Sequence, residues 1–289
     1  MKRINIFFLM LLVSTFSLSA QTIIKLYPNG VPDSNGCSGP IVKDSTNIDE
    51  VWVKNISDPF MKLYLPKKQT QNKVILICPG GGYSILSVAH EGKEVAQWYN
   101  DHGYPAAVLY SRLPNKGHYK IPLEDTQTAI KLLREHNKDW KINADTLGIM
   151  GFSAGGHLAA TALTLYNSNE DRPDFGVLFY PVITMTASTH GGSKTNLLGE
   201  TPSPTLLWKY SAEKHVTAYT PQTIIISAND DNVVPIKNSL MFYEALHDNN
   251  INSELHIFTH GGHGWAFKDS FPFEKEAEEA TLKFIADLK

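Results

Sequence analysis

Residues 147–160, LGIMGFSAGGHLAA, place a serine between small residues at the junction of two different sequence patterns. Before Ser153 the chain reads as a short apolar strand, and after it Ala and Leu recur with helical spacing. Residues 151–155 fit the pattern G-x-S-x-G, in which the serine sits on a sharp strand-to-helix turn that larger neighbours would obstruct. A plain glycine-rich turn is the other interpretation. The position between a strand and a helix that directs its free N–H groups at the turn favours Ser153 as a nucleophile.

Strand and helix patterns alternate along the rest of the chain, which predicts a single α/β domain over residues 21–289 with a mostly parallel sheet and helices on both faces. Residues 51–56 and 61–65 alternate apolar with polar, and this predicts an antiparallel hairpin at one sheet edge. Residues 182–217 lack clean periodicity and are predicted to form a lid-like insertion over the carboxyl edge of the sheet. The expected strands are 74–78, 106–110, 147–150, 175–180, 223–227 and 254–258, and the expected helices are 91–102, 123–137, 154–165, 236–249 and 274–288.

The first twenty residues have the pattern of a secretory signal peptide. Lys2 and Arg3 precede an apolar segment over residues 6–13, and small residues end at Ala20. The sequence therefore predicts an exported protein, periplasmic or extracellular. A membrane anchor is the alternative, but the apolar segment is too short to span a bilayer comfortably and no later segment qualifies, so no stable membrane insertion is expected.

Composition narrows the function classes further. The 289 residues are 42% hydrophobic and carry a formal net charge of −3, which becomes about −5 without residues 1–20. No basic cluster favours nucleic acid as a partner. Cys37 and Cys78 are the two cysteines. Export permits a disulfide, but one pair makes no disulfide framework, and the pairing stays open here; Cys78 ends an apolar strand run, as a buried thiol would.

A serine hydroxyl needs an adjacent base, and on this type of turn the acid and the base follow in the order Ser, Asp or Glu, His. Asp230 and Asp231 lie just beyond the predicted strand 223–227, and Asp231 is preferred because it lies four residues before Pro235. Beyond the next strand, His263 stands between two glycines and is preferred as the base over His260, which lies nearer the strand end.

A glycine-rich loop follows an earlier strand. Residues 80–82 are three glycines, and their backbone N–H groups are the kind of donor that stabilises a developing oxyanion. A phosphate-binding loop is the rival interpretation, but neither G-K-[ST] nor a spaced G-x-G-x-x-G accompanies the glycines. No cluster of His, Cys and carboxylates has ligand spacing, so neither a metal nor another cofactor is predicted.

The segments CPGGGY, GFSAGG, DDNVVP and GGHGW, in this order, resemble the α/β-hydrolase superfamily over nearly the whole chain. More narrowly, LYPNGVPDSNG, HEGKEVAQWYN, YSRLP and LHIFTHGGHGW are similar to secreted bacterial acetylxylan-esterase-like proteins, which are also described as esterase/lipase or xylanase-like. The resemblance implies Ser153 as nucleophile, Asp231 as orienting acid and His263 as base, with the oxyanion donors Gly81, Gly82 and Ala154. One departure is Pro79, which stands where many esterases have His.

The expected function is therefore that of a secreted serine esterase that deacetylates xylan or a related polysaccharide, with an acetylated poly- or oligosaccharide as its partner. Tyr83 and Trp265 are candidate sugar-stacking residues, as are Trp208 and Tyr180, with packing as the competing role. Two alternatives remain open. A peptidase of the prolyl-oligopeptidase kind shares the order of the three residues but needs a longer chain, and a catalytically silent carbohydrate-binding relative has no need to keep all three.

Overall fold

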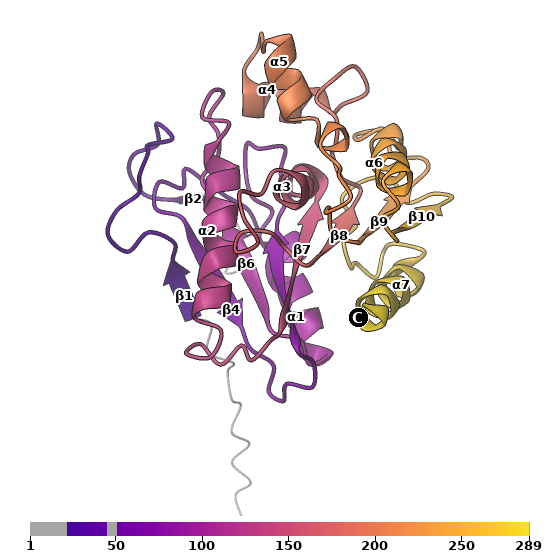
Figure 1. Ribbon diagram of the computed structural model, residues 1–289. Helices are drawn as coiled ribbons and strands as arrows, with labels where there is room; N and C mark the ends of the chain where they lie inside the picture. The colour runs from indigo at the N-terminus through magenta and orange to yellow at the C-terminus, as the bar shows by residue number, and fades with distance from the viewer. Residues whose placement is uncertain (1–21, 45–50, 289) are drawn as a thin grey trace, which may run out of the picture.

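The computed structural model describes residues 22–44 and 51–288 (Figure 1), so the predicted signal peptide lies outside the described residues. Eight strands form the main sheet, in the spatial order β1-β4-β6-β5-β7-β8-β9-β10. Their bounds, in that order, are Thr22–Lys25, Phe60–Tyr64, Ala106–Tyr110, Lys73–Cys78, Thr146–Phe152, Phe175–Phe179, Thr223–Ala228 and Glu254–Phe258.

The six strands from β6 to β10 are parallel, whereas β4 is antiparallel to both of its neighbours, β1 and β6. The carboxyl ends of the parallel strands consequently share one edge of the sheet, where ligands bind in open α/β folds. This mostly parallel sheet with helices on both faces confirms the predicted fold class.

Helices cover both faces because the central strands are apolar on both sides. In β5, for example, Val74, Leu76 and Cys78 join one hydrophobic cluster while Ile75 and Ile77 join the other. The first cluster includes buried residues of α2 (Ile121–Glu135), α3 (Ser153–Thr164) and α6 (Lys237–Asp248). The second includes residues of α1 (Glu94–Asp101) and α7 (Glu274–Asp287). The strand period of two thus divides the core into two layers.

The edge of the sheet differs from the predicted hairpin over residues 51–56 and 61–65. β3 (Val53–Lys54) pairs with β2 (Val42–Lys43) in a separate two-stranded sheet, and β4 pairs with β1 instead. The hairpin prediction is wrong because alternation marks a half-buried strand without identifying its partner. The predicted helix 91–102 also begins differently, as a π-helical turn, η1 (Ala89–Lys93), that leads into α1.

Within residues 182–217 the chain forms α4 (Gly191–Leu198), α5 (Pro204–Lys209) and a short 3₁₀ turn, η2 (Ala212–Lys214). Figure 1 shows α4 and α5 together at one end of the molecule. A side chain caps the N-terminus of each α-helix. His190 accepts a hydrogen bond from the N–H of Ser193, and Ser203 accepts one from the N–H of Leu206. These local caps explain ordered helices in a segment without a helical apolar stripe.

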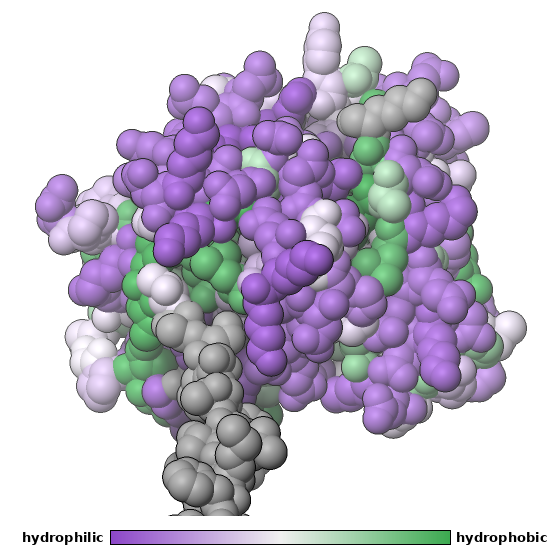
Figure 2. Space-filling view, turned by 90° about the horizontal axis from the view of Figure 1, so that it is seen from below, coloured by the Kyte–Doolittle hydropathy of each residue, from purple (hydrophilic) through white to green (hydrophobic). Residues whose placement is uncertain are grey.

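The surface opposite α4 and α5 is mostly hydrophilic, with hydrophobic residues visible in narrow stretches (Figure 2). Among the described residues, no helix is long and apolar enough to cross a membrane.

Candidate active site

Ser153 lies where β7 ends and α3 begins, and its backbone has φ of +53°, a left-handed conformation that is unusual for a residue with a side chain. The flanking glycines allow this turn. A Cβ atom on Gly151 would lie 2.2 Å from the carbonyl oxygen of Gly155, and one on Gly155 would lie 2.1 Å from that of Cys78. The small residues around Ser153 therefore permit the helix to approach both its own strand and the end of β5.

Three side chains that are far apart in the sequence form one hydrogen-bonded chain. The Ser153 hydroxyl oxygen lies 2.9 Å from Nε2 of His263, and Nδ1 of His263 lies 2.7 Å from Oδ2 of Asp231. A carboxylate only accepts, so Nδ1 carries the imidazole proton and Nε2 is left to accept the serine proton. The Asp231 side chain is 1% exposed and that of His263 is 15% exposed, so the pair is largely shielded from water.

The two neighbouring aspartates have different partners. Oδ1 of Asp231 accepts hydrogen bonds from the N–H groups of Val233 and Val234, which orients its other oxygen toward the imidazole. Asp230 instead accepts a hydrogen bond from the N–H of Gly262, which holds the pKa of its carboxyl below the usual range. The structure therefore brings Asp231 to the histidine and leaves Asp230 as a cap on the histidine loop.

The other candidate histidine, His260, does not contact the serine. Its ring packs edge-on against Phe273, and its Nδ1 lies 3.0 Å from the hydroxyl of Thr259. Of the two histidines in this turn, only His263 is hydrogen-bonded to Ser153.

The glycine loop after β5 supplies backbone donors beside the serine. The N–H of Gly80 is bonded to the carboxylate of Glu91. Within the described part of the chain, the N–H groups of Gly81 and Gly82 have no hydrogen-bond partner, and neither has that of Ala154 in the first turn of α3. These are the three amides predicted to bind an oxyanion, and Gly155 in contact with the end of β5 brings the loop and the helix together.

The Tyr83 ring is buried rather than open to a ligand. Its hydroxyl lies 2.8 Å from Nδ1 of His157, whose Nε2 lies 2.7 Å from the carbonyl oxygen of Tyr210. A backbone carbonyl only accepts, so Nε2 donates and Nδ1 accepts from Tyr83. Burial lowers the pKa of His157 to about 4. This chain ties the glycine loop to α3 and to the residue after α5.

Other aromatic residues near the histidine are also packed. Trp265 is buried and stacks on Phe271 with 3.8 Å between ring centroids, and Tyr180 is buried against both Trp265 and His263. The sugar-stacking roles predicted for Tyr83 and Trp265 do not fit this burial, because almost no part of either side chain is open to solvent. Trp208 on α5, in contrast, is 55% exposed.

Helix α4 lies over the glycine loop. Nδ2 of Asn196 donates to the carbonyl oxygen of Gly82 at 2.8 Å, and a Cβ atom on Gly82 would lie 3.8 Å from the ring of His190. Burial and the nearby His263 lower the pKa of His190. The segment predicted to be a lid therefore contacts the candidate site through α4.

Sequence reasoning missed Glu91, Tyr180 and Asn196 as residues that support the site. Each acts through a contact across the fold: Glu91 and Tyr180 are 89 positions apart, and Asn196 and Gly82 are 114 apart. No spacing pattern in the sequence marks such pairs. The only signal was the segment HEGKEVAQWYN, which contributed to the resemblance without indicating a role for Glu91.

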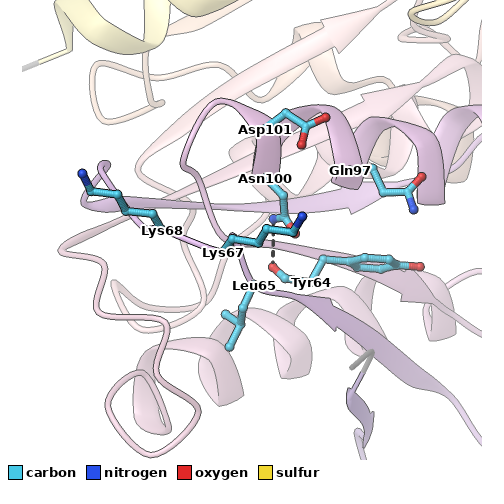
Figure 3. A pocket seen from close by; sticks show the side chains of 7 residues that line it. All are labelled: Tyr64, Leu65, Lys67, Lys68, Gln97, Asn100 and Asp101. Carbon is cyan, nitrogen blue, oxygen red and sulfur yellow. Dashed lines mark hydrogen bonds between the residues drawn. The ribbon is translucent and has the colours of Figure 1, made fainter. Parts of the chain in front are cut away.

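A pocket of about 540 Å³ lies elsewhere, between the end of β4 and α1 (Figure 3). Tyr64 pairs with Ala106, the first residue of β6, so this pocket lies at the amino ends of the parallel strands, away from the serine. Its lining includes no member of the hydrogen-bonded chain at Ser153 and consists of Tyr64, Leu65, Lys67, Lys68, Gln97, Asn100 and Asp101.

Two predictions concerned metals and cysteines. Over residues 22–44 and 51–288, no group of three or more His, Cys, Asp or Glu side chains is arranged to hold a metal ion. Cys37 and Cys78 are both free thiols, and burial raises the pKa of Cys78.

Two curated proteins resemble the chain in sequence. It is 38% identical over 221 residues to an acetylxylan esterase of Xylanibacter ruminicola and 33% identical over 219 residues to endo-1,4-beta-xylanase B of Butyrivibrio fibrisolvens. These matches cover 75% and 71% of this chain but 45% and 34% of those proteins, so the chain spans less than half the length of either curated relative.

A solved structure, that of an acetyl ester-xyloside bifunctional hydrolase from Caldicellulosiruptor lactoaceticus, superposes with a TM-score of 0.75 at 34% identity, over 92% of this chain and 95% of that one. The family described as BD-FAE matches residues 61–246, which include Ser153 and Asp231 but end before His263. The chain therefore belongs to the BD-FAE family and has the α/β-hydrolase fold.

Proposed function

We propose that this protein is a serine carboxylic-ester hydrolase with Ser153 as nucleophile, His263 as general base and Asp231 as the residue that orients the base. The observation that carries the proposal is the hydrogen-bonded chain from Ser153 through His263 to Asp231, with distances of 2.9 and 2.7 Å. A hydroxyl is a weak nucleophile unless a base accepts its proton, and this geometry provides that base. A silent relative would have no use for such an arrangement on a strained turn.

In the proposed reaction, Nε2 of His263 takes the proton from Ser153 as Oγ attacks the ester carbonyl carbon. The carbonyl oxygen becomes an oxyanion that accepts hydrogen bonds from the amides of Gly81, Gly82 and Ala154. His263 then gives its proton to the leaving alcohol oxygen as the C–O bond breaks. Water, activated by the same histidine, attacks the acyl-enzyme and releases the carboxylic acid.

We infer that the ester is an acetyl group on xylan or a related plant polysaccharide. Support comes from the relatives, since one is an acetylxylan esterase and the solved structure is an acetyl ester-xyloside hydrolase. The indole of Trp208 on α5 is the aromatic face we expect a sugar ring to contact, because large flat side chains stack on sugars. Trp208 is 55% exposed, and the ring of His215 packs edge-on against it with 4.4 Å between ring centroids.

Export is part of the proposal and rests on residues 1–20 alone, whose charged start and apolar middle match a signal peptide. An intact polymeric substrate is too large to enter a cell, which favours an exported enzyme.

The test is a substrate panel. We expect the purified protein to release acetate from acetylated xylan and from 4-nitrophenyl acetate, and to release little from feruloylated or methyl-esterified polysaccharides or from peptide nitroanilides. Cleavage of the artificial ester without release of acetate from xylan would refute the polysaccharide assignment. Cleavage of the peptide substrates alone would favour the peptidase alternative.

A further inference from the structure

Glu91 is a buried carboxylate beneath the glycine loop that the reaction scheme above does not use. It lies in the π-helical turn before α1, and its side chain is 4% exposed. Oε2 accepts a hydrogen bond from the N–H of Gly80 at 2.9 Å. A Cβ atom on Gly80 would lie 2.6 Å from this same oxygen, so the absence of a side chain at the first loop glycine makes room for the contact.

The second oxygen of Glu91 connects to the histidine loop. The Tyr180 hydroxyl donates to Oε1 at 2.9 Å and accepts a hydrogen bond from the N–H of Ala266, also at 2.9 Å. Ala266 lies three residues after His263, and the Tyr180 ring packs against the imidazole with 4.7 Å between ring centroids. One carboxylate thus joins the loop that carries the proposed oxyanion donors to the loop that carries the proposed base.

Only a carboxylate meets both demands of this position. Gly80 and Tyr180 each bring a hydrogen to Glu91, so the side chain has to accept at both terminal atoms. A glutamine has one accepting oxygen, and its NH₂ group would face one of these donors. Burial raises the pKa of Glu91, whereas the two donors and the neighbouring His263 and Lys268 lower it. The ring of His90 lies 3.9 Å from Oε1 of Glu91, and burial lowers the pKa of this histidine to about 4. Burying a carboxylate costs free energy unless hydrogen bonds compensate for the lost water, and the donors from Gly80 and Tyr180 provide that compensation.

We propose that Glu91 is a positioning residue that holds the oxyanion loop in register with His263, through Gly80 on one side and through Tyr180 and Ala266 on the other. The proposal rests on the proposed esterase function. Glu91 does not touch the reacting atoms. It fixes the distance between the donors that stabilise the oxyanion and the imidazole that moves the proton, and a misplacement of about 1 Å between such groups is enough to slow an enzyme about a hundredfold.

The competing explanation is that Glu91 only stabilises the fold, and a matched control separates the two. Asp171 is another buried carboxylate that accepts loop amides, those of Asn167 and Ser168, and no contact links it to the residues of the candidate site. Asp171→Asn should lower the melting temperature with little change in turnover. Glu91→Gln should lower turnover beyond what its effect on melting explains.

The experiment measures kcat and KM on 4-nitrophenyl acetate, and the inhibition constant of an alkyl trifluoromethyl ketone, which forms a tetrahedral adduct that needs the oxyanion donors. For Glu91→Gln we expect kcat to fall about 30- to 100-fold, below the loss of about 10²–10³ that removal of a whole oxyanion donor causes, with KM within about threefold. The inhibition constant should rise by a similar factor. For Asp171→Asn, kcat and the inhibition constant should stay within about twofold.

Tyr180→Phe provides the second variant, in case Glu91→Gln does not fold. It keeps the bond from Gly80 to Glu91 and removes the hydroxyl that bonds to both Glu91 and Ala266. We therefore expect about a tenfold loss of kcat, and less than additive losses when both substitutions are combined. A folded Glu91→Gln or Tyr180→Phe with wild-type kcat would overturn the proposal, as would a loss of kcat with unchanged inhibitor affinity. If the wild-type protein cleaves no ester, the esterase proposal itself fails, and if Ser153→Ala keeps full activity, the assignment of the nucleophile fails; both outcomes are separate from the test of Glu91.

Discussion

At the scale of single residues, the candidate site depends on which of two adjacent aspartates faces the histidine. Asp231 is hydrogen-bonded to His263 and is held by two backbone amides of its own loop, whereas Asp230 bonds to Gly262 at the surface. The two side chains are chemically identical, but because their partners differ, we expect substitutions at the two positions to affect the reaction differently.

Asp231→Asn should lower kcat on 4-nitrophenyl acetate by about 10⁴-fold, because an amide in place of the carboxylate favours the wrong imidazole tautomer. Asp230→Asn is the control and should lower kcat less than about tenfold, since it weakens one exposed hydrogen bond. Steady-state kinetics on both variants decides between them. Equal losses, or a larger loss for Asp230→Asn, would reverse the assignment of the orienting acid.

The three residues of this hydrogen-bonded chain could be predicted from the sequence because each follows the end of a recognisable strand. The chain direction of a parallel sheet brings such positions to one edge, which is a rule of topology and needs no knowledge of side-chain contacts. The burial of Tyr83 and Trp265 could not be predicted in the same way. An aromatic residue beside glycines has the same local pattern whether its ring faces solvent or stacks on a residue such as Phe271.

At the scale of elements, the turn between β7 and α3 is the feature that positions the serine, and glycine is required there for space. Gly155 packs directly on the backbone at the end of β5, where the glycine loop begins, with Cβ contacts of 2.1 Å to Cys78 and 2.5 Å to Pro79 that no side chain tolerates. The elbow and the oxyanion loop are consequently held together by close backbone contact.

Gly155→Ala should destabilise the protein by about 3 kcal/mol, because the added methyl group meets backbone atoms that cannot move aside. It should also lower kcat by separating Ala154 from the glycine loop. Gly117→Ala is the control: its Cβ meets nothing within 4 Å, so its effect should be within about 0.5 kcal/mol. Denaturant unfolding measures both. A Gly155→Ala variant as stable and active as the wild type would contradict the account of the turn.

Element predictions succeeded where burial imposes a strong period and failed at the edge of the sheet. The central strands are continuous apolar runs, as strands buried on both faces of a sheet are, so they could be predicted from the sequence. β1, with the sequence TIIK, is too short to show a pattern, and the sequence therefore predicts the wrong partner for β4. Strand pairing is a long-range property, and short edge strands carry little information about it.

At the scale of the whole molecule, a buried polar chain connects segments that are far apart in the sequence. His157 on α3 is fully buried and links the glycine loop through Tyr83 to the segment after α5 through Tyr210. Its pKa of about 4 in the folded protein lies below the ordinary value of about 6.5. The neutral imidazole is therefore part of the native structure.

This shift predicts a dependence of stability on pH. The unfolded chain binds a proton at His157 below about pH 6.5, whereas the folded protein does so only near pH 4, so stability falls as the pH drops through this window. The loss approaches roughly 3 kcal/mol, from about 1.4 kcal/mol per pKa unit. His157→Gln should be less stable at pH 7 and should lose less stability between pH 6.5 and pH 4.

Denaturant unfolding at a series of pH values tests this prediction, with His247→Gln, at an exposed position, as the control. The comparison has to be between variant and wild type. The pKa of Glu91 is raised, so its protonation stabilises the folded protein as the pH falls, opposite to the effect of His157. This contribution is the same in both proteins and cancels in the difference between their stabilities. Parallel curves for the wild type and His157→Gln would show that His157 is not the group responsible.

The central claim is that Ser153 is the nucleophile, and covalent labelling tests it most directly. Diethyl 4-nitrophenyl phosphate transfers its phosphoryl group to an activated serine, so we expect one equivalent of label per chain by intact mass, located on the peptide that contains Ser153. Ser153→Ala should take up no label and lose esterase activity. Stoichiometric label on another residue, or wild-type activity in a folded Ser153→Ala, would contradict the account.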